Sequence, residues 1–165
     1  MKWTVGKGID EYIAQLQRLE GYSDRVVGRS IYEGAKIVAD EVRKGIDSLP
    51  IREEYIKDQA TRGVTKTQKK GLQDGFGIST KKTDGTFVNV KLGFDGYNDT
   101  HTKKYPKGQP NAMVARFVES GNSYHIKTPF IGPAVNRSKS RAEDKMKLVV
   151  DQEIQAIIFC VYRSK

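Results

Sequence analysis

One apolar stripe constrains the fold more than any other feature of the sequence. Between residues 27 and 49, apolar side chains recur every three or four positions, which is the spacing of one face of an α-helix. Ser23 is a suitable N-cap, and Pro50 ends the predicted helix because the residue before a proline is disfavoured in helical conformation. So long a helix needs a partner along one whole face. The stripe consists of Val27, Ile31, Ala35, Val38, Val42, Ile46 and Leu49.

Two further stretches have the helical period. Residues 9–19 predict a first helix that Gly21 ends, and residues 137–161 predict a long closing helix. The stripe of the closing helix consists of Ala142, Met146, Val149, Val150, Ile154, Ile157, Ile158 and Val161.

Residues 76–94 alternate between apolar and polar, which predicts two strands of a hairpin. A two-residue turn at 84–85 would pair Ser79 with Val90 and put the apolar sets on opposite faces. A three-residue loop at 83–85 pairs Ile78 with Val90 and puts them on one face, so we predict that loop, with its glycine in the left-handed conformation.

These elements predict one α+β domain over residues 1–165, in which two long amphipathic helices pack on a small antiparallel β-sheet with long basic loops. The other face of the sheet is left for partners. Residues 51–72 lack an apolar period and are interpreted as a mobile basic loop, with a helical turn near 53–59.

A short helix is predicted over residues 111–121, with Asn111 as its cap and Gly121 as its left-handed stop. A strand over 113–120 is the alternative, since one short apolar run does not decide between the two. Glu119 would lie in the last turn of this helix, where a carboxylate opposes the helix dipole. We therefore expect a partner, either an Arg or a Lys, to hold Glu119 in place.

Basic residues exceed acidic ones by 29 − 20 = 9, and the excess lies between residues 61 and 107. Such a field favours an anionic partner, although a solvated surface is the commoner explanation. Tyr97 and Tyr105 lie among basic residues and are weaker candidates for stacking on single strands. The predicted basic loop site consists of Arg62, Lys66, Lys69, Lys70, Lys81 and Lys82.

No pattern in the sequence predicts an enzyme. Neither His101 nor His125 has a partner at a readable spacing, and no zinc, phosphate-loop or nucleophile-elbow motif is present. The lone Cys160 predicts a buried thiol in a protein made in a reducing cytosol. We expect no cofactor, metal, small-molecule substrate, signal peptide or membrane span.

The segment from Pro129 to Pro133 combines two rigid prolines with an apolar pair and a glycine. It predicts a rigid hook that delivers Phe130 to a pocket, either in a partner or in the protein's own core. The predicted docking residues are Glu119, Gly121, Pro129, Phe130, Ile131 and Pro133.

The blocks "ARFVESGNS" and "TPFIGPAV" resemble the signature of the head–tail joining or tail-completion proteins of long-tailed bacteriophages. Val118, Glu119 and Gly121 match its first part, and residues 129–131, 133 and 134 match its second. Leu72 with "QDGFGIS" and the stretch 8–19 are similar to further pieces of that family. Ser120 and Asn122 depart from it, since an aromatic and a Thr are common there.

The resemblance implies a nonenzymatic neck or minor tail protein of a virion, made in the bacterial cytoplasm, that assembles into a ring around the DNA path. Its implied partners are further copies of itself and tail-tube, terminator or connector proteins, and the basic loops would face packaged DNA or an acidic neighbour. A nucleic-acid-binding module without sequence preference and a small metal-dependent nuclease are the alternatives from other classes.

Overall fold

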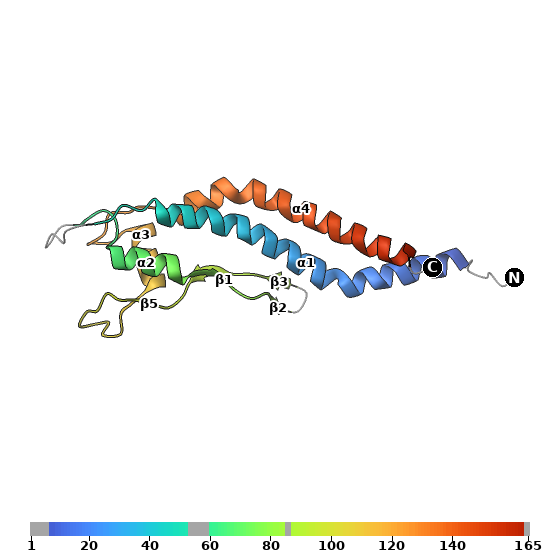
Figure 1. The fold of residues 1–165 in the computed structure, drawn as a ribbon, viewed down its shortest axis with the longest axis horizontal. Helices are drawn as coiled ribbons and strands as arrows, with labels where there is room; N and C mark the ends of the chain where they lie inside the picture. Colours follow the sequence, from blue (N-terminus) through green and yellow to red (C-terminus); the bar gives the residue numbers. More distant parts are fainter. Residues whose placement is uncertain (1–6, 53–59, 85–86, 164–165) are drawn as a thin grey trace.

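The computed structural model describes residues 7–52, 60–84 and 87–163 (Figure 1). Its helices are α1 (Lys7–Asp47), α2 (Lys66–Gly75), α3 (Asn111–Ser120) and α4 (Ile131–Arg163). Its strands are β1 (Phe76–Ile78), β2 (Lys82–Asp84), β3 (Phe87–Asn89), β4 (Leu92–Phe94), β5 (Tyr97–Asn98) and β6 (Gln109–Pro110). No helix among these residues is both long enough and apolar enough to cross a membrane.

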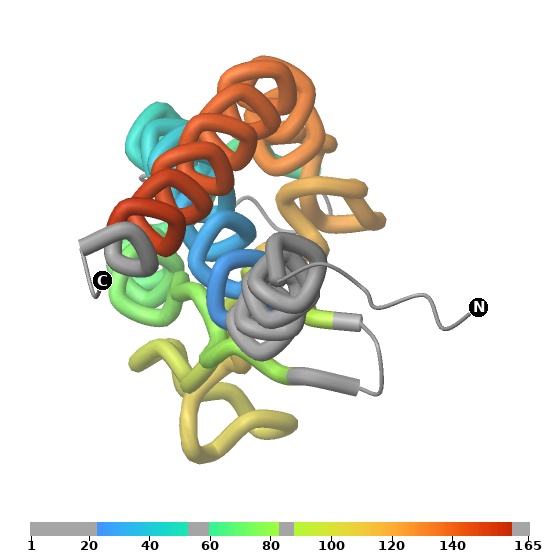
Figure 2. The backbone as a smooth tube through the Cα atoms, turned by 90° about the vertical axis from the view of Figure 1, so that its right-hand side faces the viewer, coloured from blue at the N-terminus to red at the C-terminus, as the bar shows by residue number. Residues whose placement is uncertain are grey.

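The molecule is elongated and built in layers around α1. Helix α4 runs antiparallel to α1 along one side, and α2 and the strands lie along the other side (Figures 1 and 2). The predicted α+β class, with two long helices and small antiparallel sheets, is therefore confirmed. In the described part of the chain, the strands form three two-stranded sheets rather than one.

Polar contacts fix the seam between the two long helices. The side chain of Glu41 on α1, which is only 12% exposed, lies 3.0 Å from Nη2 of Arg141 on α4 and accepts a hydrogen bond from Lys44 at 2.9 Å. The bond from Lys44, followed by that from Arg141, lowers the pKa of Glu41 to about 2. Toward the other end of the seam, Arg29 pairs with Glu153. The two pairs together fix the antiparallel alignment.

Helix α1 is one continuous helix, so the prediction of two helices separated at Gly21 is wrong. A glycine in a helix interior costs only about 1 kcal/mol relative to Ala, which the continued hydrogen-bond ladder outweighs. The predicted stop at Pro50 is close to the observed end at Asp47. Side-chain contacts of the stretch 9–19 lie outside what the structure describes.

Residues 66–72 belong to α2, so the prediction of a single loop over 51–72 is wrong. Thr65 caps this helix: its hydroxyl accepts from the amide of Gln68, and the Gln68 side chain accepts from the amide of Thr65, each at 3.1 Å. This capping box is readable in the sequence as Thr-x-x-Gln. The helical turn predicted near 53–59 lies outside the described residues.

The hairpin register also differs from the prediction. Ile78 pairs with Leu92 rather than with Val90, although the apolar residues of β1 and β4 do share a face as expected. Beyond them, the amide of Ser79 donates to the carbonyl of Lys91, and the next pair is Lys82 with Asn89. Between these two contacts, the first strand of the hairpin has two residues and the second strand has one. One extra residue in one strand is the pattern of a β-bulge. The predicted three-residue loop at 83–85 is wrong, because Thr83 and Asp84 belong to β2 and pair with Val88 and Phe87. The predicted loop glycine lies outside the described residues.

The core lies where α1, α2, α3, β1, β4 and the start of α4 meet. Ile46, Leu72 and Val114 are fully buried there, and they come from three different helices. The hydrophobic cluster is made of Ala39, Val42, Ile46, Leu49, Val64, Leu72, Phe76, Val114, Ala115, Val118, Phe130 and Ala134. This core supports the junction between α3 and α4, which carries the predicted docking residues.

Candidate functional site

The junction between α3 and α4 is organised by one carboxylate. Oε2 of Glu119, in the last turn of α3, accepts hydrogen bonds from the amides of Phe130 and Ile131 at 2.8 Å each. Its Oε1 accepts from the amide of Gly132 at 2.9 Å. We call this arrangement the Glu119 clasp. It joins two helices that are separated by a loop of ten residues, 121–130.

The clasp satisfies the free end of α4 completely. Four amides at the start of a helix have no partner within it, those of the cap residue and of the first three helical residues, and here the last of the four is Pro133, which has no N–H. The remaining three are those of Phe130, Ile131 and Gly132, and all three donate to Glu119. Pro133 is tolerated in the first turn for the same reason. The helix accordingly begins six residues before the predicted start at 137.

Electrostatics favour the charged form of Glu119. Desolvation by burial acts to raise its pKa, but the hydrogen bonds from the amides of Ile131, Gly132 and Phe130 act against it, as does the charge of Lys127, and the pKa lies below 4.5. The positive end of the α4 dipole points at the same carboxylate. We predicted that Glu119 needs a partner. Within the chain that partner is a helix N-terminus, not the expected Arg or Lys.

Phe130 fills a pocket in the protein's own core. Its side chain is 4% exposed and meets the ring of Phe94 edge to face, with centroids 6.1 Å apart. Gly45 on α1 lies against it, since a Cβ at that position would be 3.3 Å from Cβ of Phe130. The sequence left open whether Phe130 enters a pocket in a partner or in the protein's own core, and Phe130 lies in the core. Phe130 therefore fixes the start of α4 and is not free to anchor a partner.

The other predicted docking residues have distinct places at this junction. Gly121 ends α3 with φ +76°, as predicted, and its amide donates to the carbonyl of Phe117. Pro129 is exposed, and Ile131 is partly buried against the core. The helix predicted over 111–121 is confirmed over its strand alternative. Asn111 is the first residue of this helix rather than its cap, and the Asn111 side chain donates to a main-chain carbonyl outside the helix.

Asn111 belongs to a buried amide network that the sequence analysis missed. Its Nδ2 donates to the carbonyl of Asp95 at 2.8 Å, while Nδ2 of Asn98 donates to the carbonyl of Gln109 at 3.0 Å. Gly71 on α2 lets these side chains approach, since a Cβ there would lie 2.5 Å from both Oδ1 of Asn111 and Cβ of Asn98. The network attaches the β5–β6 hairpin to α2 and α3.

The histidines occupy unrelated places. The ring of His125 stacks on Phe117 at 6.0 Å, and burial, with the charge of Arg52, lowers its pKa. Nδ1 of His101 donates to the carbonyl of Pro106 at 2.8 Å in the β5–β6 loop. Within the described residues, no group of three or more His, Cys, Asp or Glu side chains is placed to hold a metal ion.

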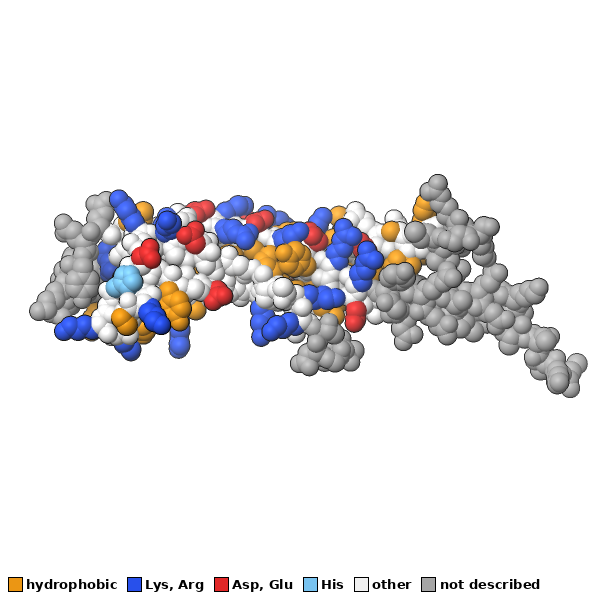
Figure 3. Space-filling view, turned by 60° about the horizontal axis from the view of Figure 1, so that its bottom comes forward, with side chains coloured by type: hydrophobic (Ala, Val, Ile, Leu, Met, Phe, Trp, Pro, Cys, Tyr) orange, Lys and Arg blue, Asp and Glu red, His pale blue; other side chains and the backbone are white. Residues whose placement is uncertain are grey.

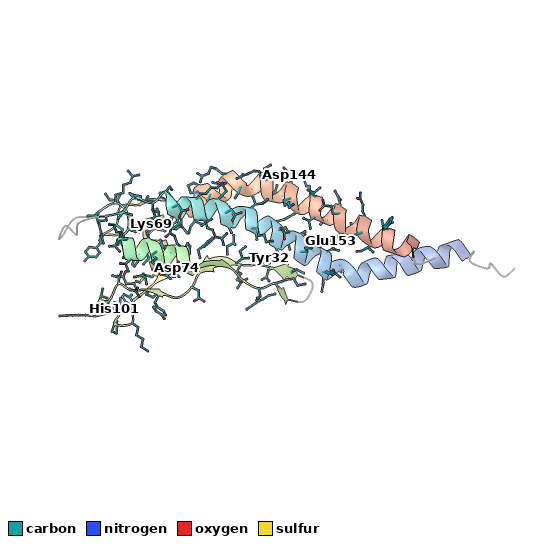
Figure 4. The ribbon with its side chains drawn as sticks, viewed as in Figure 1. Tyr32, Lys69, Asp74, His101, Asp144 and Glu153 are labelled. Carbon is teal, nitrogen blue, oxygen red and sulfur yellow. The ribbon has the colours of Figure 1, made fainter. Side chains whose placement is uncertain are left out.

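The basic residues predicted as one loop site do not form one. Lys69 donates to the carbonyls of Asp47 and Leu49 and so caps the end of α1, as its position in Figure 4 indicates. Lys81 donates to the carbonyl of Asp24 at 3.2 Å on the side of α1. The others are exposed: Lys66 and Lys70 lie on α2, Arg62 lies in the segment before α2, and Lys82 lies on β2. On the face seen in Figure 3, basic side chains are spread along the molecule among acidic ones.

Comparisons of the chain with protein families, with curated proteins and with solved structures give no match.

Proposed function

We propose that this chain is a structural protein of a phage or prophage virion. In this proposal it completes the tail or joins head to tail at the neck, where it assembles into a ring around the DNA path. Its neighbours are further copies of itself and tail-tube, terminator or connector proteins. The observation that carries the proposal is a group of apolar side chains left uncovered on the outer half of α4.

This group, the outer α4 residues, consists of Leu148, Ile154, Ile158 and Phe159. Their exposed fractions are 48%, 36%, 44% and 65%. Ile154 and Ile158 lie one helical turn apart on one side, and Leu148 and Phe159 lie eleven residues, about three turns, apart on another. Single exposed apolar residues are ordinary, but four within twelve positions of one helix are typical of a contact surface.

The organisation of α4 explains why neither α2 nor the described strands cover them. Helix α4 packs along α1, while α2 and the small sheets lie on the far side of α1 (Figure 1). The sheets therefore cannot reach the outer side of α4. A neighbouring subunit can, and ring formation requires such contacts between two different surfaces of each subunit.

The resemblance to tail-completion proteins adds a second support. The two sequence blocks that carry it are separated along the chain, and they meet in the Glu119 clasp. Residues shared with that family thus build one junction that fixes the direction of α4. The junction is structural: it orients the helix whose outer half carries the uncovered side chains.

The assembly step is tested with the purified chain by light scattering after size exclusion, over a range of concentrations. We expect a discrete oligomer at high concentration that the double variant Ile158→Ser/Phe159→Ser no longer forms. Ile126→Ser is the matched control, since Ile126 is 48% exposed at the opposite end of the molecule. A wild-type chain that stays monomeric throughout, or a control variant that disrupts the oligomer equally, would contradict this role for α4.

The virion role is tested by deleting the gene from the phage or prophage that encodes it. We expect filled heads and separate tails, or tails with an incomplete end, under the electron microscope. Plasmid expression of the wild-type chain should restore joined particles, and expression of Ile158→Ser/Phe159→Ser should not. Intact, infectious particles produced without the gene would refute the proposal.

A further inference from the structure

The loop between β5 and β6 (residues 99–108) presents basic side chains on a rigid support. We call it the basic hairpin loop. It projects from the layer of strands away from α1, with His101 on it (Figures 1 and 4). Three lysines lie within it, Lys103, Lys104 and Lys107, and all three are exposed. Asp99 is the one acidic residue in the loop.

Hydrogen bonds hold the loop in one shape. The amides and carbonyls of Thr102 and Tyr105 bond to each other, at 3.1 and 3.0 Å, and close a tight turn around Lys103 and Lys104. The bond from His101 to the carbonyl of Pro106 crosses the loop. At its base, Gly108 has φ +100° and lies so close to Asn98 that a Cβ would be 2.1 Å from the carbonyl oxygen.

The base is anchored in the buried amide network. Asn98 is 4% exposed, and its Oδ1 accepts from the amide of Thr100 at 3.0 Å while its Nδ2 bonds to the carbonyl of Gln109. The lysines are therefore displayed by a loop with little freedom to collapse onto the surface. A preorganised charge loses less conformational entropy on binding than one on a flexible segment.

The charges of this loop are not used within the described part of the chain. Among the described residues, no ion pair includes Lys103, Lys104 or Lys107, and Lys104 lies over the ring of Tyr105, with Nζ 5.6 Å from the ring centroid. Lys69 and Lys81, by contrast, are bound to main-chain carbonyls. The three lysines of the loop therefore have no ion pair within the described residues, and hydrogen bonds hold the loop that carries them in one shape.

We infer that the basic hairpin loop binds the phosphate backbone of duplex DNA without sequence preference. Lysine acts on phosphate as a point charge, whereas lysines are depleted from interfaces between proteins. The loop also has no Leu, Ile, Val, Met, Phe or Trp that a protein partner would bury. The inference rests on the proposed function only for the choice of anion, which is the DNA that passes through the neck.

The test measures binding of the full chain to two labelled DNA duplexes of unrelated sequence, by fluorescence anisotropy at several salt concentrations. Each phosphate contact contributes about 0.9 to the slope of log affinity against log salt. We expect the triple variant Lys103→Ala/Lys104→Ala/Lys107→Ala to reduce the slope by roughly 2–3 and the low-salt affinity by about tenfold or more. Both duplexes should give the same result.

A matched control removes the same charge elsewhere. The variant Lys66→Ala/Lys70→Ala/Lys82→Ala changes three exposed lysines outside the loop, and its slope should stay close to that of the wild type. Equal losses in both variants would mean that net charge alone binds DNA, and this would overturn the inference. So would absence of binding by the wild type at low salt.

Two further outcomes separate this inference from related ideas. If the loop variant lost binding to polyglutamate but kept binding to DNA, the partner would be an acidic protein and the inference would be wrong. The loop variant should also form the same oligomer as the wild type in light scattering. DNA binding and oligomer formation are thus measured by separate assays. A negative result for one proposal does not refute the other.

Discussion

Replacing Glu119 should destabilise the fold, because its carboxylate joins the end of α3 to the start of α4. The variant Glu119→Ala leaves the amides of Phe130, Ile131 and Gly132 without their acceptor. Losing a capping side chain costs about 1–2 kcal/mol. Losing a partly buried negative charge at a helix N-terminus costs up to about 2 kcal/mol more.

The expected loss in free energy of unfolding is therefore about 1–4 kcal/mol. For a chain of this length, that corresponds to a fall in Tm of about 2–16 °C. The assay is urea unfolding followed by circular dichroism, with a thermal scan as a second measurement. Asp144→Asn is the matched control, because Asp144 is exposed on the outer side of α4 and should change stability by less than about 0.5 kcal/mol.

The pH dependence gives an independent check on the mechanism. The pKa of Glu119 is lower in the folded protein than its ordinary value of 4.5. Its contribution is therefore fully present above about 4.5 and is lost as pH falls through the lower, folded-state pKa. The gap in stability between wild type and Glu119→Gln should narrow over that acidic range. A Glu119→Ala variant within 0.5 kcal/mol of wild type, or a gap that does not change with pH, would refute the clasp.

Three further substitutions test the structure around the clasp. Phe130→Ala should cost about 3–5 kcal/mol, because it empties a core pocket, and a variant that is as stable as wild type in urea would mean the pocket is not filled. Gly71→Ala should cost about 1–3 kcal/mol because its Cβ meets the buried asparagines, whereas Gly77→Ala, which meets nothing within 4 Å, is the control in the same melting assay. Lys69→Met should cost about 1–2 kcal/mol by uncapping α1, and equal stability of Lys69→Met and the exposed control Lys70→Met would contradict that role.

The parts of the fold that depend on local periodicity were predictable from the sequence. The stripe over 27–49 became the C-terminal half of α1 and the two residues after it, and Gly21 was misread as a stop because one glycine costs less than a break in a long helix. The start of α2 was also readable, since Thr65 and Gln68 have the spacing of a capping box. The hairpin register was not: Ile78 pairs with Leu92, two residues from the predicted Val90, and the bulge beyond that pair shifts the register by one more residue without a clear signal in the sequence.

Only part of the Glu119 clasp could be predicted from the sequence. The position of Glu119 near a helix C-terminus showed that it needed a partner, but amides eleven to thirteen residues away carry no side-chain signature. The roles of Lys69 and Lys81 were hidden for the same reason, because main-chain carbonyls are acceptors in every sequence. A count of basic residues therefore overstated the charge available to a partner around residues 62–82.

The two ends of α4 are built for different purposes. At its start, Phe130 is buried and the Glu119 clasp satisfies the free amides, so that end is fixed by contacts within the chain. At its far end, Ile158 and Phe159 remain exposed, and burying them takes a second surface. Burial of apolar area contributes about 25 cal/mol per Å², so the stability of the far end should grow with assembly while that of the start does not. In the proposed assembly, a change at Glu119 acts first on folding and a change at Phe159 acts first on contacts between subunits, so melting and oligomer formation should respond separately to the two variants.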